Sequence, residues 1–465
     1  MEKLKAKEIA KLSGASLVSG DENVVISEVI IDSRQAVNGS MFVALKGEST
    51  DGHRFLVNAL EGGAKAFLIS DMDAALEYGK DIFDRKDVAV LHCRDSLNAL
   101  QELSGNYLLN LNMRCIAVTG SVGKTTTRDM LYAAVGAKYK AGTNKKNYNS
   151  ETGLPLTLLS FEKKMEVGVL EMGMDSLGQI ARLVEIAEPE AAVITNIGIS
   201  HIERLGSREN IMKAKMEVTK FFGAENTLVV NWDDDMLSTL NEELLPYKLI
   251  KVGSKEECQY RITDIEDRGV GGIAFTLISS QGEERIELPV PGSHNAINCA
   301  LALAGAKTMG VEIQDAIRGI KNMKMTGSRL NVVRAGGITL IDDSYNAAPA
   351  SMKSAIDTLS NTEAKRRIAV LGGINELGKQ SEKEHRGVGK HLSEKNIDLL
   401  ITVGEMAKWI GEEGSKTKQV ISFETKEDIY PEIKKIFKPG DAVLIKGSRS
   451  YELDKLSEEI LKEYK

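Results

Sequence analysis

The segment GSVGKTTT contains the residues of this chain whose types and spacing are best suited to bind phosphate. It follows a short apolar run, Ile116–Val118, which predicts a buried strand, and it opens an amphipathic stretch, which predicts a helix. Glycines let backbone N–H groups converge on an anion, and the N-terminus of the helix adds the positive end of its dipole. The predicted nucleotide-phosphate site consists of Gly120, Ser121, Val122, Gly123, Lys124, Thr125 and Thr126.

Within this segment, Lys124 is the cation that can reach the β- and γ-phosphates, and a hydroxyl of Thr125 or Thr126 can ligate Mg²⁺. The strict phosphate-loop pattern requires a glycine where this chain has Val118, so the segment is the shorter Gly-x-x-Gly-Lys-Thr form. The alternative is an ordinary loop between a strand and a helix. The order of glycine, lysine and threonine, together with the flanking elements, favours nucleotide binding.

The composition narrows the class of protein. At 465 residues the chain is long enough for about three domains. Its net charge of −7 argues against nucleic acid or an anionic membrane as the main partner. The four cysteines lack paired spacing, which favours reduced thiols in a cytoplasmic protein. The first residues are charged throughout, unlike a signal peptide, and no run of 18 apolar residues occurs. We expect a monomer.

The strand and helix signals predict an α/β protein with three domains, at residues 1–108, 109–327 and 328–465. The first is a small α/β domain. The second contains the glycine-rich segment and alternates strands with helices, which predicts a parallel, doubly wound sheet with ligands beyond the carboxyl ends of its strands. The third is Rossmann-like but lacks Gly-x-Gly-x-x-Gly, so a dinucleotide site is unsupported. Its expected strands are Ile338–Asp342, Arg367–Leu371, Leu399–Val403, Val420–Phe423 and Ala442–Ile445.

Polar residues near predicted strand ends in the second domain are candidate ligands. Glu171 and His201 are plausible Mg²⁺ ligands, although histidine is an unusual one and His201 could instead be structural. Lys215 is by default a surface lysine. Asn295 and Asn298, three residues apart, could face an adenine edge. Capping of a helix by Ser293 or Asn295 competes with that interpretation.

In the first domain, two polar clusters follow neighbouring predicted strands. Arg34 and Lys46 could hold a diphosphate, and Ser33 could donate a hydrogen bond to it. A solvated turn with incidental charges is the alternative, and the residues alone favour it.

Taken together, these motifs resemble those of the Mur ligases, the ATP-dependent amide-forming ligases of peptidoglycan precursor synthesis. The resemblance covers essentially the whole chain. It rests on Asp32-Ser33-Arg34 with FVALKGE and DGHRF, GSVGKTTT, NYNSETGLPLTLL, EMGMDSLGQI, TNIGISHIERLGSRENI with Ala-Lys-Met-Glu, HNAIN, GSRL, DDSYNAAPASM and Asn-Glu-Leu-Gly.

The resemblance implies a role for each candidate. Thr125 or Thr126, Glu171 and His201 would hold two Mg²⁺ ions, and Lys215 would carry a carbamate that acts as a further ligand. Asn295 and Asn298 would meet the adenine side of ATP. Arg329 would reach the phosphates from the domain border and couple domain closure to ATP. The remaining implied contacts are Asp343 and Asn346 to the nucleotide, and Ser33, Arg34, Lys46 and Asn149 to the UDP-linked substrate.

Within the family, the block Tyr345-Asn346-Ala347-Ala348-Pro349 favours one step. That step joins D-alanyl-D-alanine to UDP-N-acetylmuramoyl-tripeptide through an acyl-phosphate. Addition of the third stem amino acid, whether diaminopimelate or lysine, is the nearest alternative. A P-loop kinase or nucleotide switch is a second alternative, and a non-catalytic scaffold is the least favoured. The chain departs from the family at Ser150, where asparagine is frequent, and at Gly373, where the family often has aspartate, which leaves an acceptor-side role at that position open.

Overall fold

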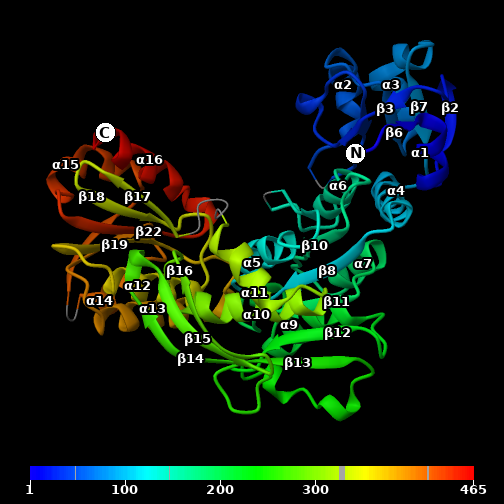
Figure 1. Cartoon of the computed structure of the whole chain (residues 1–465). Coiled ribbons are helices and arrows are strands. Elements are labelled where there is room, and N and C mark those ends of the chain that lie inside the picture. Colours follow the sequence, from blue (N-terminus) through cyan, green and yellow to red (C-terminus); the bar gives the residue numbers. More distant parts are fainter. Residues whose placement is uncertain (48, 146, 324–329, 416–417, 465) are drawn as a thin grey trace. The chain divides into compact units, whose positions relative to one another are not determined.

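The computed structural model describes residues 1–47, 49–145, 147–323, 330–415 and 418–464, and these residues form two compact units (Figure 1). The first unit comprises Met1–Ala117, Tyr139–Met174 and Gly178–Glu190. The second comprises Val118–Lys138, Asp175–Leu177 and Ala191–Lys465. The strand β8 (Arg114–Thr119) carries the chain from the first unit into the second.

The first unit begins with a five-stranded sheet in the order β2-β7-β6-β5-β4, parallel except for β2. Its strands are β2 (Ser16–Gly20), β4 (Glu28–Ile30), β5 (Ser40–Val43), β6 (Ala66–Ile69) and β7 (Ala89–His92), and β1 (Leu4–Lys5) pairs separately with β3 (Val25–Ile26). Its helices are α1 (Ala6–Ser13), α2 (Leu56–Glu61), α3 (Met72–Phe83) and α4 (Ser96–Leu111). Alternate residues of the central strands pack against α1 and α4 on one face and against α2 and α3 on the other, which gives a three-layered domain.

Two further strands and two helices complete the first unit. The strands β9 (Ala141–Thr143) and β10 (Val167–Glu171) pair in parallel. The helices α6 (Gly153–Leu159) and α7 (Gln179–Ala187) both contact α4. Glu171 is therefore the last residue of a buried strand, which fixes its position firmly.

The second unit begins with the end of β8 and the helix α5 (Lys124–Gly136). Four strands pair in parallel and two more extend the sheet antiparallel: β11 (Ala191–Ile194), β12 (Thr227–Asn231), β13 (Lys248–Gly253), β14 (Tyr260–Asp267), β15 (Ile273–Ser279) and β16 (Gly282–Leu288). The other helices of this part are α8 (Ile202–Leu205), α9 (Arg208–Met216), α10 (His294–Thr308) and α11 (Ile313–Lys321). The small, buried residues of α10 let it pack closely against α5 and across β11–β15.

The C-terminal part of the second unit contains a six-stranded sheet in the order β17-β18-β22-β19-β20-β21. The strands are β17 (Asn331–Ala335), β18 (Ile338–Asp342), β19 (Arg366–Gly372), β20 (Leu399–Val403), β21 (Gln419–Phe423) and β22 (Asp441–Lys446). The helices α12 (Pro349–Ser360), α13 (Ser381–Ser393) and α14 (Lys408–Gly414) cover one face, and α15 (Ile433–Ile436) and α16 (Leu453–Glu463) cover the other.

The structure confirms the α/β class and corrects two details of the sheets. The middle sheet is not wholly parallel, because β15 and β16 are antiparallel to their neighbours. The C-terminal sheet has a sixth strand, β17, which is antiparallel to β18. Both additions lie at sheet edges, where an antiparallel strand needs only a short hairpin connection.

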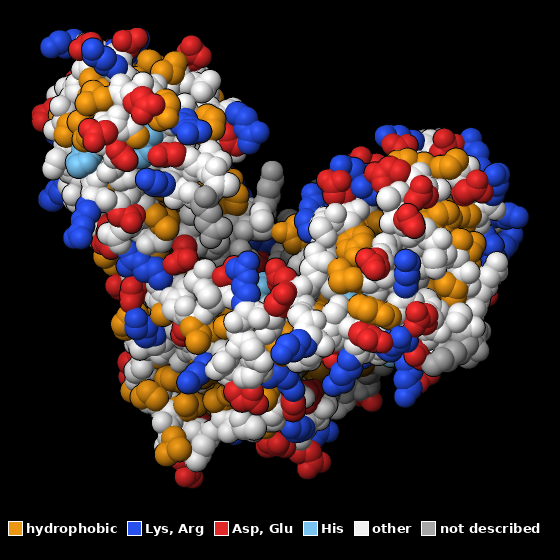
Figure 2. Space-filling view, turned by 180° about the vertical axis from the view of Figure 1, so that it is seen from behind, with side chains coloured by type: hydrophobic (Ala, Val, Ile, Leu, Met, Phe, Trp, Pro, Cys, Tyr) orange, Lys and Arg blue, Asp and Glu red, His pale blue; other side chains and the backbone are white. Residues whose placement is uncertain are grey.

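The helices and the visible surface lack membrane-spanning and nucleic-acid-binding features in the part of the chain that the structure describes. None of the helices in the described ranges is both long and apolar enough to span a bilayer. On the face that Figure 2 shows, Lys and Arg side chains are interspersed with Asp and Glu side chains. This mixed pattern on the visible face is unlike the continuous basic surface that binds a phosphate backbone.

Candidate functional site

The glycine-rich loop lies between β8 and α5, and its geometry requires two of its glycines. Gly120 has a φ of 147° and Gly123 has a φ of 82°, both in the region that favours glycine. A Cβ atom on Gly120 would lie 1.9 Å from Thr195 Oγ1, and one on Gly123 would lie 2.8 Å from Asn298 Oδ1. The loop therefore leaves no room for side chains at these positions.

Two residues after β11 hold the loop in place. The side-chain amide of Asn196 accepts the N–H of Val122 at 3.0 Å and donates to the Val122 carbonyl at 2.9 Å. The hydroxyl of Thr195 donates to the same carbonyl at 2.6 Å. Neither residue was among the predicted site residues, although the position of Asn196 at a predicted strand end was a usable signal. A loop fixed in advance binds its anion with a smaller ordering cost.

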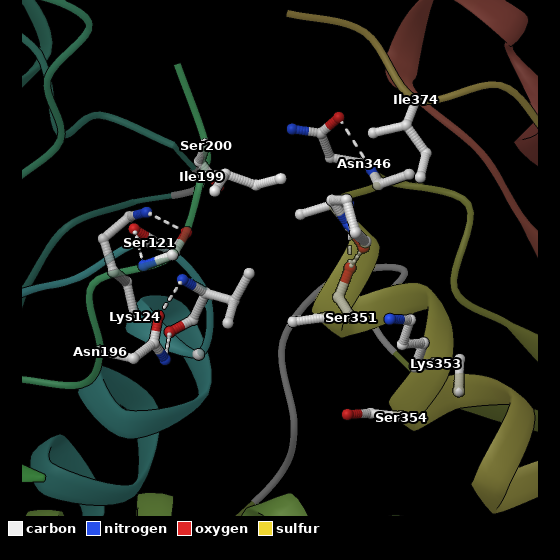
Figure 3. Close-up of a pocket in the computed structure, with 18 of the residues that line it drawn as sticks. Ser121, Lys124, Asn196, Ile199, Ser200, Asn346, Ser351, Lys353, Ser354 and Ile374 are labelled. Carbon is white, nitrogen blue, oxygen red and sulfur yellow. Dashed lines mark hydrogen bonds between the residues drawn. The ribbon is translucent and has the colours of Figure 1, made fainter. Parts of the chain in front are cut away.

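Lys124 is the first residue of α5, and its ammonium folds back over the loop. It donates to the carbonyl of Gly120 at 2.9 Å and to that of Ser121 at 3.2 Å, and Figure 3 shows Lys124 beside Ser121. A cation at the N-terminus of a helix, beside a glycine loop, is suited to neutralise polyphosphate. Thr125 and Thr126 follow in the first turn, and Thr126 lines the adjoining cavity.

Lys215 is not the surface lysine that its default interpretation suggested. It lies in α9 with only 2% of its surface exposed. Burial lowers the pKa of Lys215 well below its usual value, and the positive charge of Lys124 lowers the pKa further. The structure thus contains a buried amine that favours the neutral form.

His201 precedes α8 and has a left-handed backbone, with a φ of 63°. Its Nδ1 atom lies 2.6 Å from a carboxylate oxygen of Glu376, although the angles between the two groups do not make a hydrogen bond. Burial lowers the pKa of His201, and the Glu376 carboxylate opposes that shift. A residue of the C-terminal part thus reaches a candidate ligand of the middle part.

Glu171 is buried in the first unit, and two asparagines surround it. Asn149 Nδ2 donates to its carboxylate at 2.7 Å. Asn144 accepts the backbone N–H of Glu171 at 2.6 Å and donates to its carbonyl at 3.1 Å. Asn149, predicted to contact the substrate, therefore holds the carboxylate of Glu171.

Asn295 and Asn298 lie in the first turns of α10 and are both buried. Asn295 donates to the Pro291 carbonyl at 2.7 Å, and Asn298 donates to Asn295 Oδ1 at 2.8 Å. Ser293 stands at the N-cap without a side-chain hydrogen bond, so capping by Ser293 is wrong. Asn298 instead packs against Gly123 of the glycine loop.

The C-terminal wall of the site is built on a buried ion pair. Lys446 at the end of β22 lies 2.6 Å from the carboxylate of Asp343 and donates to the Asn346 carbonyl at 2.9 Å. The other oxygen of Asp343 accepts the N–H of Leu330 at 3.2 Å. Arg329, predicted to reach the phosphates, lies outside the described residues.

A cavity of about 840 Å³ lies within the second unit, and several of these groups line it (Figure 3). The glycine loop, Lys124 and His201 line one wall, and residues of β18–α12, β19–α13 and β22–α16 line the other. Asp343, Asn346 and Glu376 belong to the second wall. Most of the predicted nucleotide residues thus border one space: Ser121, Val122, Gly123, Lys124, Thr126, Asn295, Asn298, Asp343 and Asn346.

The loop that carries Glu376 is held by its neighbours. The Ile374 N–H donates to His385 Nε2 at 2.9 Å, and His385 Nδ1 lies 2.6 Å from the Ser381 carbonyl, to which it donates. The ring of Trp409 meets the His385 ring edge-on, 5.6 Å between centroids. A Cβ atom at Gly373 would lie 2.3 Å from the hydroxyl of Tyr451. The tyrosine therefore fills the space that a side chain at this position would need.

The predicted residues of the N-terminal domain follow the ends of β4 and β5, which are parallel neighbours. Ser33 and Arg34 lie in a 3₁₀ turn, and the exposed Arg34 pairs with Asp32 at 2.7 Å. The backbone of Lys46 pairs with that of Asp51 in an isolated antiparallel β-bridge. Of the predicted metal ligands, Glu171 lies in this first unit and the others lie in the second. No group of three or more His, Cys, Asp or Glu side chains suited to a metal occurs in the described ranges.

Comparison with known proteins gives consistent matches along the chain. Three family models match: "Mur ligase family, catalytic domain" over residues 25–107, "Mur ligase middle domain" over 118–306, and "Mur ligase, glutamate ligase domain" over 328–449. The UDP-N-acetylmuramoyl-tripeptide–D-alanyl-D-alanine ligase of Bacillus subtilis is 35% identical, with 99% of each chain covered.

Solved structures agree with these matches. A crystal structure of MurF from Acinetobacter baumannii has a TM-score of 0.89 at 28% identity and covers 99% of each chain. The MurF ligase of Thermotoga maritima, solved in complex with ADP, has a TM-score of 0.80 at 29% identity, with 94% of this chain and 97% of that chain covered. Sequence and fold lead to the same conclusion: the chain belongs to the Mur ligase family.

Proposed function

We propose that this chain is an ATP-dependent ligase that joins D-alanyl-D-alanine to UDP-N-acetylmuramoyl-tripeptide, with release of ADP and phosphate. The observation that carries the proposal is the shared cavity, in which the glycine loop and Lys124 face the C-terminal wall that contains Asp343 and Asn346. The Bacillus subtilis relative, which matches along the whole chain, bears the name of this activity.

The chemistry explains why such a site needs a phosphate loop. A carboxylate is a poor electrophile, so its oxygen first takes the γ-phosphoryl group of ATP to give an acyl-phosphate and ADP. The amine of D-alanyl-D-alanine then attacks the acyl carbon, phosphate leaves, and the amine loses a proton. Phosphoryl transfer depends chiefly on positioning and charge neutralisation, which the loop N–H groups and Lys124 supply.

The nucleotide contacts form part of this proposal. Gly120 and Gly123 allow the loop to adopt its phosphate-binding conformation, because a Cβ atom at either position would collide with Thr195 or Asn298. Asn295 and Asn298 border the loop and would meet the adenine side, and Asp343 and Asn346 would contact the nucleotide from the opposite wall. The last predicted contact is Arg329.

The proposal includes a magnesium site, whose ligands the family resemblance implies. Glu171 offers a buried carboxylate, Thr125 or Thr126 offers a hydroxyl, and His201 offers a ring nitrogen; oxygen donors suit Mg²⁺. Bound Mg²⁺ would neutralise charge on the phosphate oxygens. Lys215 would join this set as a carbamate, which forms when a neutral amine adds CO₂ and loses a proton. The lowered pKa of Lys215 supports that reaction.

The first domain would hold the UDP end of the substrate through Ser33, Arg34 and Lys46, with Asn149 acting near Glu171. We propose domain boundaries at residues 1–108, 109–327 and 328–465. We further propose that the protein acts as a monomer in the cytoplasm, where ATP and nucleotide-linked precursors are found. Light scattering after size-exclusion chromatography tests the oligomeric state, and the mass of a dimer would contradict the proposed monomer.

The central experiment measures phosphate release from ATP in the presence of UDP-N-acetylmuramoyl-tripeptide alone, D-alanyl-D-alanine alone, and both compounds together. Release that requires both UDP-N-acetylmuramoyl-tripeptide and D-alanyl-D-alanine, with the ligated product seen by mass spectrometry, supports the proposal. Phosphate release that instead requires a UDP-linked dipeptide together with diaminopimelate or lysine would indicate the step that adds the third stem residue. Phosphorylation of an acceptor without ligation would indicate a kinase.

The carbamate has its own test. Lys215→Ala removes the amine and is expected to lose most activity, and added formate or acetate should restore part of it by supplying a carboxylate to the vacated space. Full activity of Lys215→Ala would exclude the carbamate. Lys213→Ala, on the same helix, is the matched control and should keep its activity.

A further inference from the structure

The C-terminal wall of the cavity also carries charged groups that the proposed nucleotide contacts do not use. Its cations and carboxylates come from α12, from the loop after β19, from α13 and from the segment after β22. Figure 3 shows Lys124 on one side of the space, with Lys353 and Ile374 on the other side. Groups on this far wall face the phosphate loop across the cavity.

The ammonium of Lys353 differs from the other cations that line the cavity. The others have partners close by, which are the Gly120 and Ser121 carbonyls for Lys124, Asp235 for Arg208, Asp343 for Lys446 and Asp454 for Arg449. Lys353 is half-buried in α12, and no carboxylate of the described residues lies within ion-pair distance of its ammonium. A half-buried cation without a counter-charge favours an anionic ligand in the adjoining space.

Glu376 supplies a carboxylate to the same wall, from a different element than Lys353. Glu376 lines the cavity with 49% of its side chain exposed, and it lies against His201 on the phosphate-loop side. Its φ of 63° is uncommon for a residue other than glycine. The structure holds the loop in that shape, because the Asn375 N–H donates to Ser448 and its side chain donates to Ser450. Backbone strain of this kind is concentrated at functional sites.

We infer that this wall is the acceptor subsite, in which Lys353 binds the carboxylate of the incoming dipeptide and Glu376 receives its ammonium end. The inference rests on the proposed ligase function. It also fixes the orientation of the bound dipeptide. The amine must approach the acyl-phosphate, and Glu376 is the charged residue that lies beside His201 on the phosphate-loop side. The carboxylate then points away from the phosphates, toward α12.

The size of the acceptor requires charges that come from separate elements. The ends of an extended dipeptide are at most roughly 7 Å apart, so one side chain cannot bind both. Lys353 comes from α12 and Glu376 from the loop after β19. An acceptor without a free carboxylate would lose the Lys353 contact and keep the other.

The test compares D-alanyl-D-alanine with D-alanyl-D-alaninamide, which lacks the negative charge. In the wild type, we expect the amide to have a KM roughly 10- to 100-fold higher than the acid, as for loss of a charge-assisted hydrogen bond. Lys353→Met should raise the KM of the acid by a similar factor, with little change in kcat or in the KM of ATP. It should not raise the KM of the amide further, and Lys353→Arg should recover most of the affinity for the acid.

The exposed Lys390 of α13 supplies the control, because Lys390→Met removes a lysine that does not line the cavity. Equal use of acid and amide by the wild type would overturn the inference and leave the ligase function intact. A change in the KM of ATP or of the UDP-linked substrate in Lys353→Met would assign the lysine to another anion and overturn it as well. A wild type that ligates neither acceptor would overturn the proposed function together with the inference.

Discussion

The buried pair of Asp343 and Lys446 allows a quantitative test of the C-terminal wall. Their side chains are 11% and 3% exposed and lie 2.6 Å apart. Asp343→Asn keeps an oxygen for the Leu330 N–H but removes the charge, which leaves the Lys446 ammonium buried without its partner. Lys446→Met does the reverse and also removes the hydrogen bond to the Asn346 carbonyl.

The expected cost follows from the burial of the pair. Exposed ion pairs contribute about 0–1 kcal/mol, but loss of one partner of a buried pair costs about 3–5 kcal/mol because the other charge remains desolvated. Each single variant should therefore lower the free energy of unfolding of the C-terminal sheet by about 3–5 kcal/mol. The double variant Asp343→Asn/Lys446→Met contains no buried charge and should recover most of that loss.

Native-state hydrogen exchange reads this region without requiring the whole chain to unfold in one step. Peptides from β18 and β22 should exchange roughly 100- to 5,000-fold faster in each single variant, at about 1.4 kcal/mol per tenfold change. Lys455→Met, which removes an exposed pair with Glu452, is the control and should change exchange by less than about fivefold. Losses below about 1 kcal/mol in the single variants would refute the reasoning.

Three further predictions concern the loop, one histidine and the thiols. Gly123→Ala should lower kcat/KM for ATP by roughly 100-fold, because the loop must move, whereas Gly136→Ala, with no atom near its Cβ position, should be tolerated. Burial lowers the pKa of His385, so the unfolded chain binds the proton more readily than the folded chain. The stabilisation from the neutral ring is therefore fully present above about pH 6.5. Below that pH, the free energy of unfolding should fall by up to about 1.4 kcal/mol per pH unit. His385→Asn should reduce that slope in urea unfolding, and an unchanged slope would contradict it. Burial raises the pKa of Cys258 to about 11 and of Cys115 to about 12, so iodoacetamide at pH 8 should label them only after unfolding, as read by mass spectrometry.

Hydrophobic runs and turn residues predicted much of the fold. The strands β18 and β20 begin and end at the predicted residues, because each is an apolar run bounded by polar residues. The edge strands β16 and β17 were not predicted, because both are partly exposed and neither contains an apolar run longer than two residues. The pairing partners of such strands are set by tertiary contacts.

The site divides in the same way. The glycine loop is local in sequence, so its spacing was enough to predict a phosphate site. The position of Asn196 at a predicted strand end is a usable signal, but its hydrogen bonds to Val122 and the approach of Glu376 to His201 depend on the tertiary fold. The burial of Lys215 also depends on its surroundings, since its helix alone predicts a surface residue. The family resemblance, and not the local pattern, singled out that lysine.

The contact between His385 and Trp409 gives the molecule an optical reporter. The chain has two tryptophans; Trp232 follows β12, beneath the Lys251 ammonium, and Trp409 lies in α14 against the imidazole. His385 Nε2 accepts the N–H of Ile374, so the imidazole is neutral while the loop is in place; a protonated imidazole, which requires that this hydrogen bond break, quenches indole emission. Fluorescence from Trp409 should therefore follow movement of the loop in real time, while Trp232 serves as a reference within the same molecule.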